Sequence, residues 1–414
     1  MESKRPGIAG VLLALVLLLA GCGNETECGE FPLDEDDRIC VVETIDEMVD
    51  EHYPFAEDKG VDLDAFSAAL WSAVDDAEDG GDADFLADVN RALTILEDGH
   101  TRIEQQRLEE VGMAPAGVRR VDGEIVVDRV DDPDRAELIG ASVAKIDGVD
   151  ADRALADAKG RTETSVDGEV SLSGNRLALG GEAGSELRMT MDDGTTVTMT
   201  RVSPHDKPEV RRYGDDIGYL RIDTFAYIDD LERIDAALAE VEDTSGLMID
   251  LRGNGGGYPS VTEGLFARLI AEERSSFEMV DVDGEHHRTL EMEPRGETYE
   301  GEVVLLVDRG SYSASNFFSH RVKYHRRGVL VGEQTGGGAA SPQQGVMLLP
   351  GVWFQVSTHV VRDPDGEHAE SGLTPEIPVD IEEESGDEGE IVHPLGATGD
   401  PVKDRAIRYL EGLP

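Results

Sequence analysis

Short apolar runs alternate with amphipathic stretches over the second half of the chain. Four runs rich in Val, Ile, Leu and Met carry this pattern, at 217–222, 246–251, 303–307 and 329–332. Runs of this length, separated by stretches of helical periodicity, are typical of strands buried in a largely parallel sheet. The pattern therefore predicts an α/β core over residues 213–381, in which strand and helix repeat.

Apolar positions at helical spacing dominate the earlier part of the chain, and residues 35–106 are predicted to form an N-terminal helical region. The positions expected in its core are Ile45, Met48, Val49, Phe66, Leu70, Phe85, Val89, Leu93 and Leu96. Residues 111–202 instead alternate strand-like segments with turns, which predicts a β-rich domain inserted before the core. Residues 382–414 are expected to be an acidic linker followed by a helix at 401–410.

One serine lies where a strand gives way to a helix. The apolar run at 303–307 breaks at Gly310, and a helical pattern resumes after Ser313. A strand-to-helix turn projects one side chain away from the sheet, and the free N–H groups of the first helical turn stabilise negative charge beside it. Ser313 is therefore a candidate nucleophile, although Ser313 or Ser315 could instead be a simple helix N-cap.

A glycine run follows the strand predicted at 246–251. The sequence Asn254-Gly255-Gly256-Gly257 leads into a helical pattern from about 260 to 270. The run could be a flexible turn or a phosphate cradle, but its spacing fits neither the dinucleotide fingerprint nor the P-loop. An oxyanion hole is the better use of N–H groups at this place.

A histidine follows the helical stretch at 82–96. His100 comes directly after Gly99, where the helix is expected to have ended. A histidine in this position is often a C-cap or a partner of the helix dipole. Together with Ser313 and the glycine run, however, His100 is a candidate general base.

These three segments, with 331–338 and 370–376, resemble the C-terminal-processing and tricorn-like serine peptidases, which have a crotonase-like fold. The resemblance covers about residues 40 to 385. It implies a crotonase-like α/β catalytic core and a serine endopeptidase that hydrolyses peptide bonds of proteins or peptides. The alternative is an inactive peptidase-like scaffold that binds peptides or an apolar ligand; esterase or transpeptidase activity would use the same groups.

The resemblance also assigns roles to residues. The C-terminal-processing branch has a lysine base at the position that Gly338 occupies here, so this chain looks like the tricorn-like branch, with His100 as base. Glu370 matches the supporting acid, although it could be an ordinary solvated carboxylate. The expected oxyanion donors are the N–H groups of Ala314 and of one glycine in the run at 255–257, with Gly256 as the first choice. The tricorn-like branch carries a serine just before its base, where this chain has a glycine.

The histidine base predicts activity that rises through roughly pH 6 to 7 as the imidazole loses its proton. No cofactor and no metal are expected, because the histidines show no metal-binding spacing. His286 and His287 are adjacent, so on a strand they would point to opposite faces. A surface loop is the expected place of this pair.

The start of the chain resembles a bacterial lipoprotein signal. Lys4 and Arg5 precede an apolar run at 8–20, and Leu-Ala-Gly leads into Cys22. This implies a signal peptide at 1–21, lipidation of Cys22 and a polar tether at 22–34, which would anchor the chain in the cell envelope, facing the periplasm or the exterior. An ordinary secretory signal is the alternative.

The two remaining cysteines, Cys28 and Cys40, could form a disulfide in such a compartment, or they could be free thiols.

The chain is strongly acidic, with 37 basic and 89 acidic residues and a formal net charge of −52. This charge disfavours nucleic-acid binding. It favours either a surface that stays hydrated in high salt or one that selects cationic substrates.

Residues 140–149 resemble a stretch of PDZ-like domains. That resemblance implies a PDZ-like fold for residues 111–202, which would bind peptide termini by strand addition. A structural insert without a ligand groove is the alternative.

Overall fold

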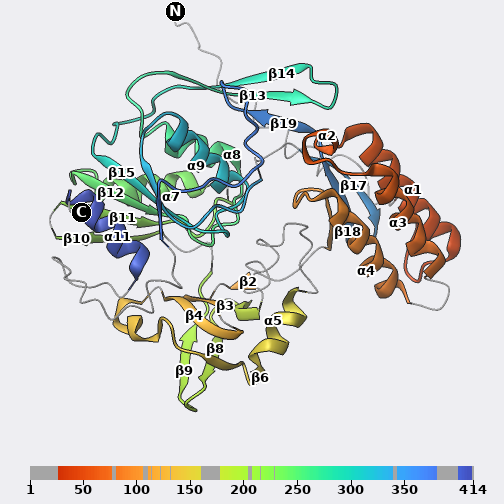
Figure 1. Cartoon of the computed structure of the whole chain (residues 1–414), viewed down its shortest axis with the longest axis horizontal. Coiled ribbons are helices and arrows are strands. Elements are labelled where there is room, and N and C mark those ends of the chain that lie inside the picture. The colour runs from red at the N-terminus through yellow and green to blue at the C-terminus, as the bar shows by residue number, and fades with distance from the viewer. Residues whose placement is uncertain are drawn as a thin grey trace, which may run out of the picture.

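The computed structural model shows an α/β core, a set of N-terminal helices and a small β-rich unit (Figure 1). It describes residues 27–76, 81–105, 111–112, 114–121, 123–130, 132–159, 178–203, 208–214, 216–227, 229–338, 343–379 and 400–412. The predicted signal peptide, Cys22 and the predicted acidic linker before residue 400 lie outside these residues. Within the described ranges, no helix is both long and apolar enough to cross a bilayer.

The core is built on a six-stranded sheet whose neighbours are parallel except for the first pair. In sheet order the strands are β10 (Glu209–Tyr213), β11 (Ile217–Arg221), β12 (Gly246–Asp250), β15 (Glu302–Val307), β16 (Val329–Gly332) and β20 (Ile377–Pro378). Every residue of β11 and β12 is buried, which explains why these strands have no polar face.

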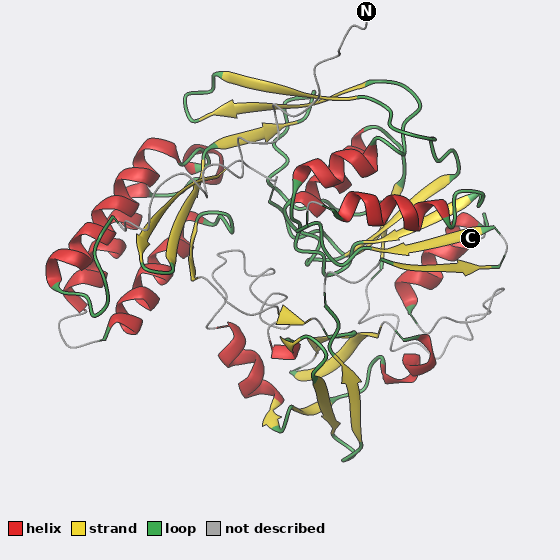
Figure 2. Cartoon of the chain, turned by 180° about the vertical axis from the view of Figure 1, so that it is seen from behind, coloured by secondary structure: helices red, strands yellow, loops and turns green. Residues whose placement is uncertain are grey.

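Helices cover both faces of this sheet. Leu247 and Ile249 of β12 pack in one cluster with α7 (Asp230–Ala239), α8 (Pro259–Phe266) and α9 (Ala314–Tyr324). Met248 faces the other way and packs with α11 (Pro401–Leu410). The alternation along one strand therefore produces a three-layered core (Figure 2). The four strands and the last helix lie where the sequence predicts them.

Parallel pairing brings the carboxyl ends of β12 and β15 to the same edge of the sheet. The Leu251 N–H donates to Leu306 O across this edge (2.9 Å). The glycine run after β12 and the turn after β15 therefore lie side by side, which is where open α/β sheets place their sites.

The N-terminal helices share a core with strands from the far end of the chain. They are α1 (Glu35–His52), α2 (Ala56–Lys59), α3 (Leu63–Asp76), α4 (Asp82–Leu93) and the 3-10 turn η1 (Thr94–Leu96). They pack on a sheet of β1 (Arg102–Gln105), β18 (Val352–Ser357) and β17 (Gln343–Leu349). Val41, Phe85 and Phe354 belong to this one cluster.

The β-rich unit has its own apolar cluster, which includes Val127, Leu155 and Met189. Its strands are β3 (Ala116–Val121), β4 (Glu124–Val130), β5 (Val143–Ile146), β6 (Val149–Asp150), β8 (Glu186–Met191) and β9 (Thr196–Thr200), with the short pair β2 (Val111–Gly112) and β7 (Gly181–Glu182) and the 3-10 segment η2 (Pro133–Leu138). A helix, α5 (Ala151–Lys159), interrupts the expected alternation of strands and turns, and Asp150 accepts an N–H of its first turn.

A three-stranded sheet completes the fold. It consists of β14 (His286–Met292), β13 (Arg274–Asp281) and β19 (His359–Arg362). The expectation that His286 and His287 lie in a surface loop is wrong, because both residues begin β14. The segment pairs as an antiparallel hairpin with β13, with Val280 opposite His286.

Candidate active site

Ser313 stands at the N-cap position of α9, yet its side chain caps nothing. Its backbone has φ +56° and ψ −123°, a region that non-glycine residues rarely adopt. The Ser313 N–H donates to Gly337 O (3.0 Å), and the Tyr312 N–H donates to Asn254 O (3.0 Å), so neighbouring loops hold the turn in place. Because its hydroxyl caps no helix N–H, this geometry fits a serine presented at a strand-to-helix turn better than a structural cap.

His100 lies directly against this serine. Its Nε2 is 2.7 Å from Ser313 Oγ, and both residues are buried. The turn before His100 is fixed by Asp98, whose carboxylate accepts the His100 N–H (2.9 Å) and the Thr101 hydroxyl (2.6 Å). The Gln355 amide donates to His100 O (2.9 Å) from β18. Strand β18, which the sequence did not predict, therefore helps to position the histidine.

The other side of the imidazole faces Tyr312 and Asp98. The Tyr312 ring stacks on the His100 ring, with centroids 5.1 Å apart and an interplanar angle of 25°. The Tyr312 hydroxyl is 3.5 Å from Nδ1, and Asp98 Oδ1 is 3.9 Å from Nδ1. These contacts leave Nε2 as the nitrogen that faces the serine.

Burial lowers the pKa of His100 to about 4. The Asp98 carboxylate opposes this shift, and the cations of Arg102 and Lys59 add to it. The imidazole is therefore neutral, and able to accept a proton, well below the pH 6 to 7 range expected from the sequence. That expected range is revised downward by the burial of the ring.

The glycine run touches Ser313. Gly256 has φ +98°, and a Cβ there would lie 2.7 Å from Ser313 Cβ and 2.8 Å from Ala314 N. Only glycine fits this position without a clash. The Gly256 N–H, however, donates to Asn254 Oδ1 (2.9 Å), so the donor predicted from the sequence is already engaged in this structure.

Glu370 is linked to the histidine side of the site by an ion pair with Lys59. Its Oε1 accepts a hydrogen bond from Lys59 Nζ (3.1 Å), and the side chain is 6% exposed. The Glu370 carbonyl accepts the Gly338 N–H (2.8 Å). Glu370 is thus a buried, paired carboxylate and not a solvated one.

Gly338 packs against His100. It has φ +70°, and a Cβ there would lie 2.8 Å from the Tyr312 ring and 3.0 Å from His100 Cε1. The histidine and the tyrosine therefore fill the space next to Gly338.

Three residues of the site were missed by sequence reasoning: Asp98, Tyr312 and Lys59. Asp98 and Tyr312 adjoin motif residues, so their proximity in sequence was an available signal. Lys59 lies 41 positions before His100 and carries no such signal. Among the described residues, no group of three His, Cys, Asp or Glu side chains could hold a metal ion.

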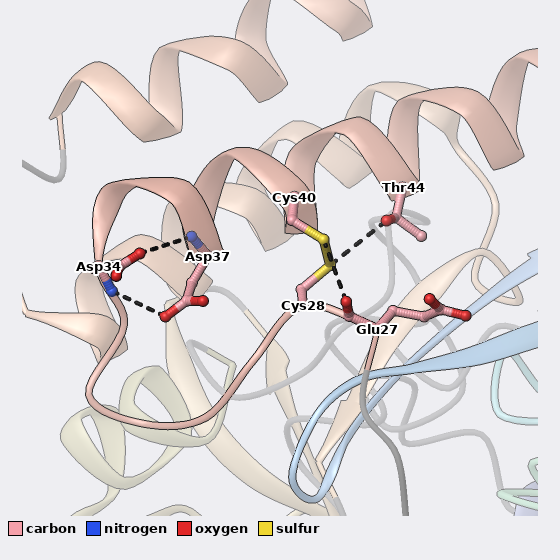
Figure 3. The surroundings of a disulfide bond; sticks show 6 residues. All are labelled: Glu27, Cys28, Asp34, Asp37, Cys40 and Thr44. Carbon is pink, nitrogen blue, oxygen red and sulfur yellow. Dashed lines mark hydrogen bonds between the residues drawn. A yellow bond between two sulfur atoms is a disulfide. The ribbon is translucent and has the colours of Figure 1, made fainter.

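A disulfide joins Cys28 to Cys40 (Figure 3). It ties the chain before α1 to the second turn of that helix. Figure 3 also shows how α1 begins: the Asp34 side chain accepts the Asp37 N–H (3.0 Å), and Asp37 accepts the Asp34 N–H (3.1 Å). This reciprocal pair is a capping box, and it fixes the start of the helix.

The chain is similar in sequence to known peptidases. Residues 216–379 match the family profile described as Peptidase family S41. The chain is 24% identical over 246 residues to the carboxy-terminal processing protease CtpB of Bacillus subtilis (strain 168), which covers 59% of this chain and 48% of that protein. The chain thus spans about half the length of this relative.

Two solved structures share the fold over most of the chain. The structure of mature CPAF has a TM-score of 0.58 at 13% identity and covers 90% of this chain and 95% of its own. The photosystem II D1 C-terminal processing protease has a TM-score of 0.52 at 18% identity and covers 89% of this chain and 99% of its own.

Proposed function

Because residues 216–379 match the profile of Peptidase family S41, we propose that this protein is a serine endopeptidase that hydrolyses peptide bonds of proteins or peptides. The reaction proceeds through an acyl-enzyme on Ser313, with His100 as the general base. The observation that carries this proposal is the 2.7 Å contact between His100 Nε2 and Ser313 Oγ, made by a serine that caps no helix.

The proposed sequence of steps uses these two side chains throughout. His100 Nε2 takes the hydroxyl proton while Ser313 Oγ attacks the carbonyl carbon and the carbonyl oxygen becomes an oxyanion. The intermediate collapses, the C–N bond breaks, and the imidazolium gives its proton to the leaving amine. His100 then takes a proton from water, and the hydroxide attacks the ester carbonyl. The C–Oγ bond breaks, the imidazolium returns its proton to Ser313 Oγ, and the carboxylic acid is released.

The oxyanion is stabilised by backbone N–H groups. The Ala314 N–H begins helix α9 beside the nucleophile, which supports its role as the first donor. Gly256 is the proposed second donor, and its N–H must leave Asn254 Oδ1 to reach the oxyanion. Losing one such donor typically costs about a hundredfold or more in rate.

Glu370 supports the charge network on the histidine side by pairing with Lys59. This assignment, with glycine at position 338 and a histidine base, is what supports the tricorn-like branch over a Ser–Lys dyad. The serine that this branch carries before its base is replaced by Gly99, whose carbonyl accepts a hydrogen bond from Arg102 (2.8 Å).

We also propose that the reaction takes place in the cell envelope, with the chain anchored by lipid on Cys22. The leader-like sequence before Cys22 supports this. The disulfide between Cys28 and Cys40 fits an oxidising compartment.

The unit at 111–202 is the proposed PDZ-like region, which would hold substrate or gate the site. Its contact with the core supports a coupled role, since Arg119 of β3 donates to Glu333 in the loop after β16.

Hydrolysis of a denatured protein and of a peptide library tests the proposed activity. We expect the wild-type chain to cleave both, and Ser313→Ala and His100→Ala to lose cleavage by at least about a thousandfold. Ser315→Ala is the matched control, because the Ser315 hydroxyl is buried on the same helix and has no hydrogen-bond partner among the described residues. Equal cleavage by wild type and Ser313→Ala would overturn the proposal.

A further inference from the structure

We propose that Lys59 is a positioning residue for the general base. Its ammonium group holds the turn that carries His100 and joins this turn to the loop of Glu370. The proposal rests on the proposed function, since it assigns a role to Lys59 in the activity of the pair Ser313 and His100.

The first contact of Lys59 is with the histidine turn. Lys59 ends the short helix α2, and its Nζ donates to Glu97 O (2.5 Å), three positions before His100. Glu97 has φ +49°, a left-handed backbone that is costly for a residue with a side chain. A charge-assisted hydrogen bond to the carbonyl of this residue stabilises the turn in the strained form.

The second contact is with the carboxylate of Glu370, at 3.1 Å. The two side chains are only 15% and 6% exposed. A largely buried charge that loses its partner is strongly unfavourable, so each group holds the other in place. The Phe55 ring lies 4.7 Å from Nζ and confines the ammonium further.

Lys59 thereby links the two chain segments that lie on either side of the His100 imidazole. The Glu370 carbonyl accepts the Gly338 N–H, and Gly338 lies against His100 Cε1. On the other side, Glu97 leads through Asp98 into His100. A single ammonium group therefore fixes both the chain that carries the base and the loop that packs against it.

Lys59 also places a positive charge near the base. The charged and polar groups that face the imidazole are Asp98, Arg102, Lys59, Glu104 and the hydroxyls of Tyr312 and Ser313. The lysine cation disfavours the imidazolium and contributes to the lowered pKa of His100. Removing this cation should raise that pKa, whereas removing only the Glu370 carboxylate should lower it.

The test compares Lys59→Met and Lys59→Arg with the wild-type chain. The readouts are kcat, KM and the pH profile of kcat/KM for a peptide that the wild type cleaves, and the rate of fluorophosphonate labelling of Ser313. Misplacement of a reacting group by about 1 Å can cost a hundredfold, so we expect Lys59→Met to lower kcat by about ten- to a hundredfold with little change in KM. The acid limb should move to higher pH, and Lys59→Arg should recover part of the rate.

Lys323→Met is the matched control. Lys323 makes the same two kinds of contact, donating to Thr374 O (2.6 Å) and pairing with Glu376 (3.2 Å), on the far part of α9. We expect its rate and pH profile to equal those of the wild type. Glu370→Gln should move the acid limb to lower pH, opposite to Lys59→Met.

Two results would overturn the role of Lys59 while leaving the proposed function intact. The first is a Lys59→Met variant with the kcat and pH profile of the wild type. The second is a Lys59→Met variant whose rate loss is explained by lowered thermal stability and whose acid limb of kcat/KM does not shift. If the folded wild type does not react at Ser313, the proposed function fails, and this inference fails with it. A wild type that reacts at Ser313 while Lys59→Met reacts equally fast leaves the function standing and removes only the inference.

Discussion

Ser313 has a backbone that a structural N-cap does not need. Its φ of +56° costs on the order of 1 to 3 kcal/mol and persists only where the surroundings impose it. Two hydrogen bonds hold this backbone, from the Tyr312 N–H to Asn254 O and from the Ser313 N–H to Gly337 O. Asn254 lies in the glycine run, and Gly337 lies in the loop after β16. The strain therefore falls at the residue whose hydroxyl lies 2.7 Å from His100 Nε2, as expected for a nucleophile held ready.

The pH dependence of kcat/KM follows from the burial of His100. The base is the neutral imidazole, and its pKa is lowered to about 4. Activity should therefore rise with pH through about 4 and be level from pH 6 to 8, measured with a peptide substrate across pH 3.5 to 8.

An acid limb of kcat/KM with its midpoint near pH 6.5 would contradict the burial of the His100 imidazole. Fluorescence at each pH is the control, because folding itself weakens on the acid side. His100 and His320 both have their pKa lowered to about 4 by burial, so their contribution to stability is lost as pH falls from about 6.5 to 4.

At the residue scale, sequence reasoning reached the groups that stand at the ends of elements. Ser313, His100 and the glycine run each follow a strand or helix whose pattern marks its end. Asp98 and Tyr312 adjoin these groups in the sequence, which was a signal that could have found them. The importance of Lys59 depends on contacts made only after folding. The hydrogen bond from Gly256 to Asn254 was equally beyond reach, because it depends on loop conformation.

At the element scale, a buried ionic network fixes the glycine run and the last helix to the sheet. Arg252, just before the run, donates to Asp250 (2.7 Å) and to Asp400 (2.8 Å), and Asp400 also caps α11. Burial would raise the pKa of Asp250, but Arg252 and Arg221 outweigh it and hold that pKa well below its usual range. Asp250 and Arg252 are therefore both charged in the folded chain.

Asp400→Ala should destabilise the protein through this network. It leaves part of the Arg252 guanidinium buried without its partner and removes the cap of α11. Breaking a buried pair in this way typically costs about 3 to 5 kcal/mol, which urea denaturation would measure. Activity should fall as well, because Arg252 adjoins the glycine run.

The control for this variant is Asp243→Ala, which removes a surface partner of Arg212 that is 73% exposed. Its effect on stability should be small. Equal stability of Asp400→Ala and the wild type would show that α11 is not held by this network.

The elements of the core were predictable because parallel strands buried on both faces are continuous apolar runs. The joining of the N-terminal helices to β17 and β18 was not predictable. The two parts lie some 250 positions apart, and a short strand pattern does not specify its partner. Helix α5 was missed because a single short helix in a strand-rich region gives little periodicity.

At the scale of the whole molecule, the net charge of −52 is the dominant feature. Only seven residues are lysine, and most of the ion pairs in the described residues use arginine. Like charges at this density repel one another and weaken the folded state in dilute buffer. Salt reduces this repulsion by shortening its range.

We therefore expect the melting temperature to rise with KCl between 0.1 and 2 M. The Debye length falls from about 10 Å at 0.1 M to about 3 Å at 1 M, which removes most of the repulsion between surface carboxylates. Thermal melting followed by fluorescence measures this. A melting temperature that is constant or falls with salt would contradict a surface adapted to high salt.

In that case a surface that selects cationic substrates becomes the better explanation. It predicts that kcat/KM for Arg-rich and Lys-rich peptides decreases with salt, while kcat/KM for neutral peptides stays the same.

The most direct test of the central claim is intact-mass analysis after reaction with a fluorophosphonate probe. The account predicts that the wild-type chain gains the mass of one probe, on Ser313, and that Ser313→Ala gains none. His100→Ala should react far more slowly, since the hydroxyl has then lost its base, and Ser315→Ala should react like the wild type. A folded wild-type chain that gains no probe, or a Ser313→Ala variant that gains it equally well, would contradict an acyl-enzyme on Ser313.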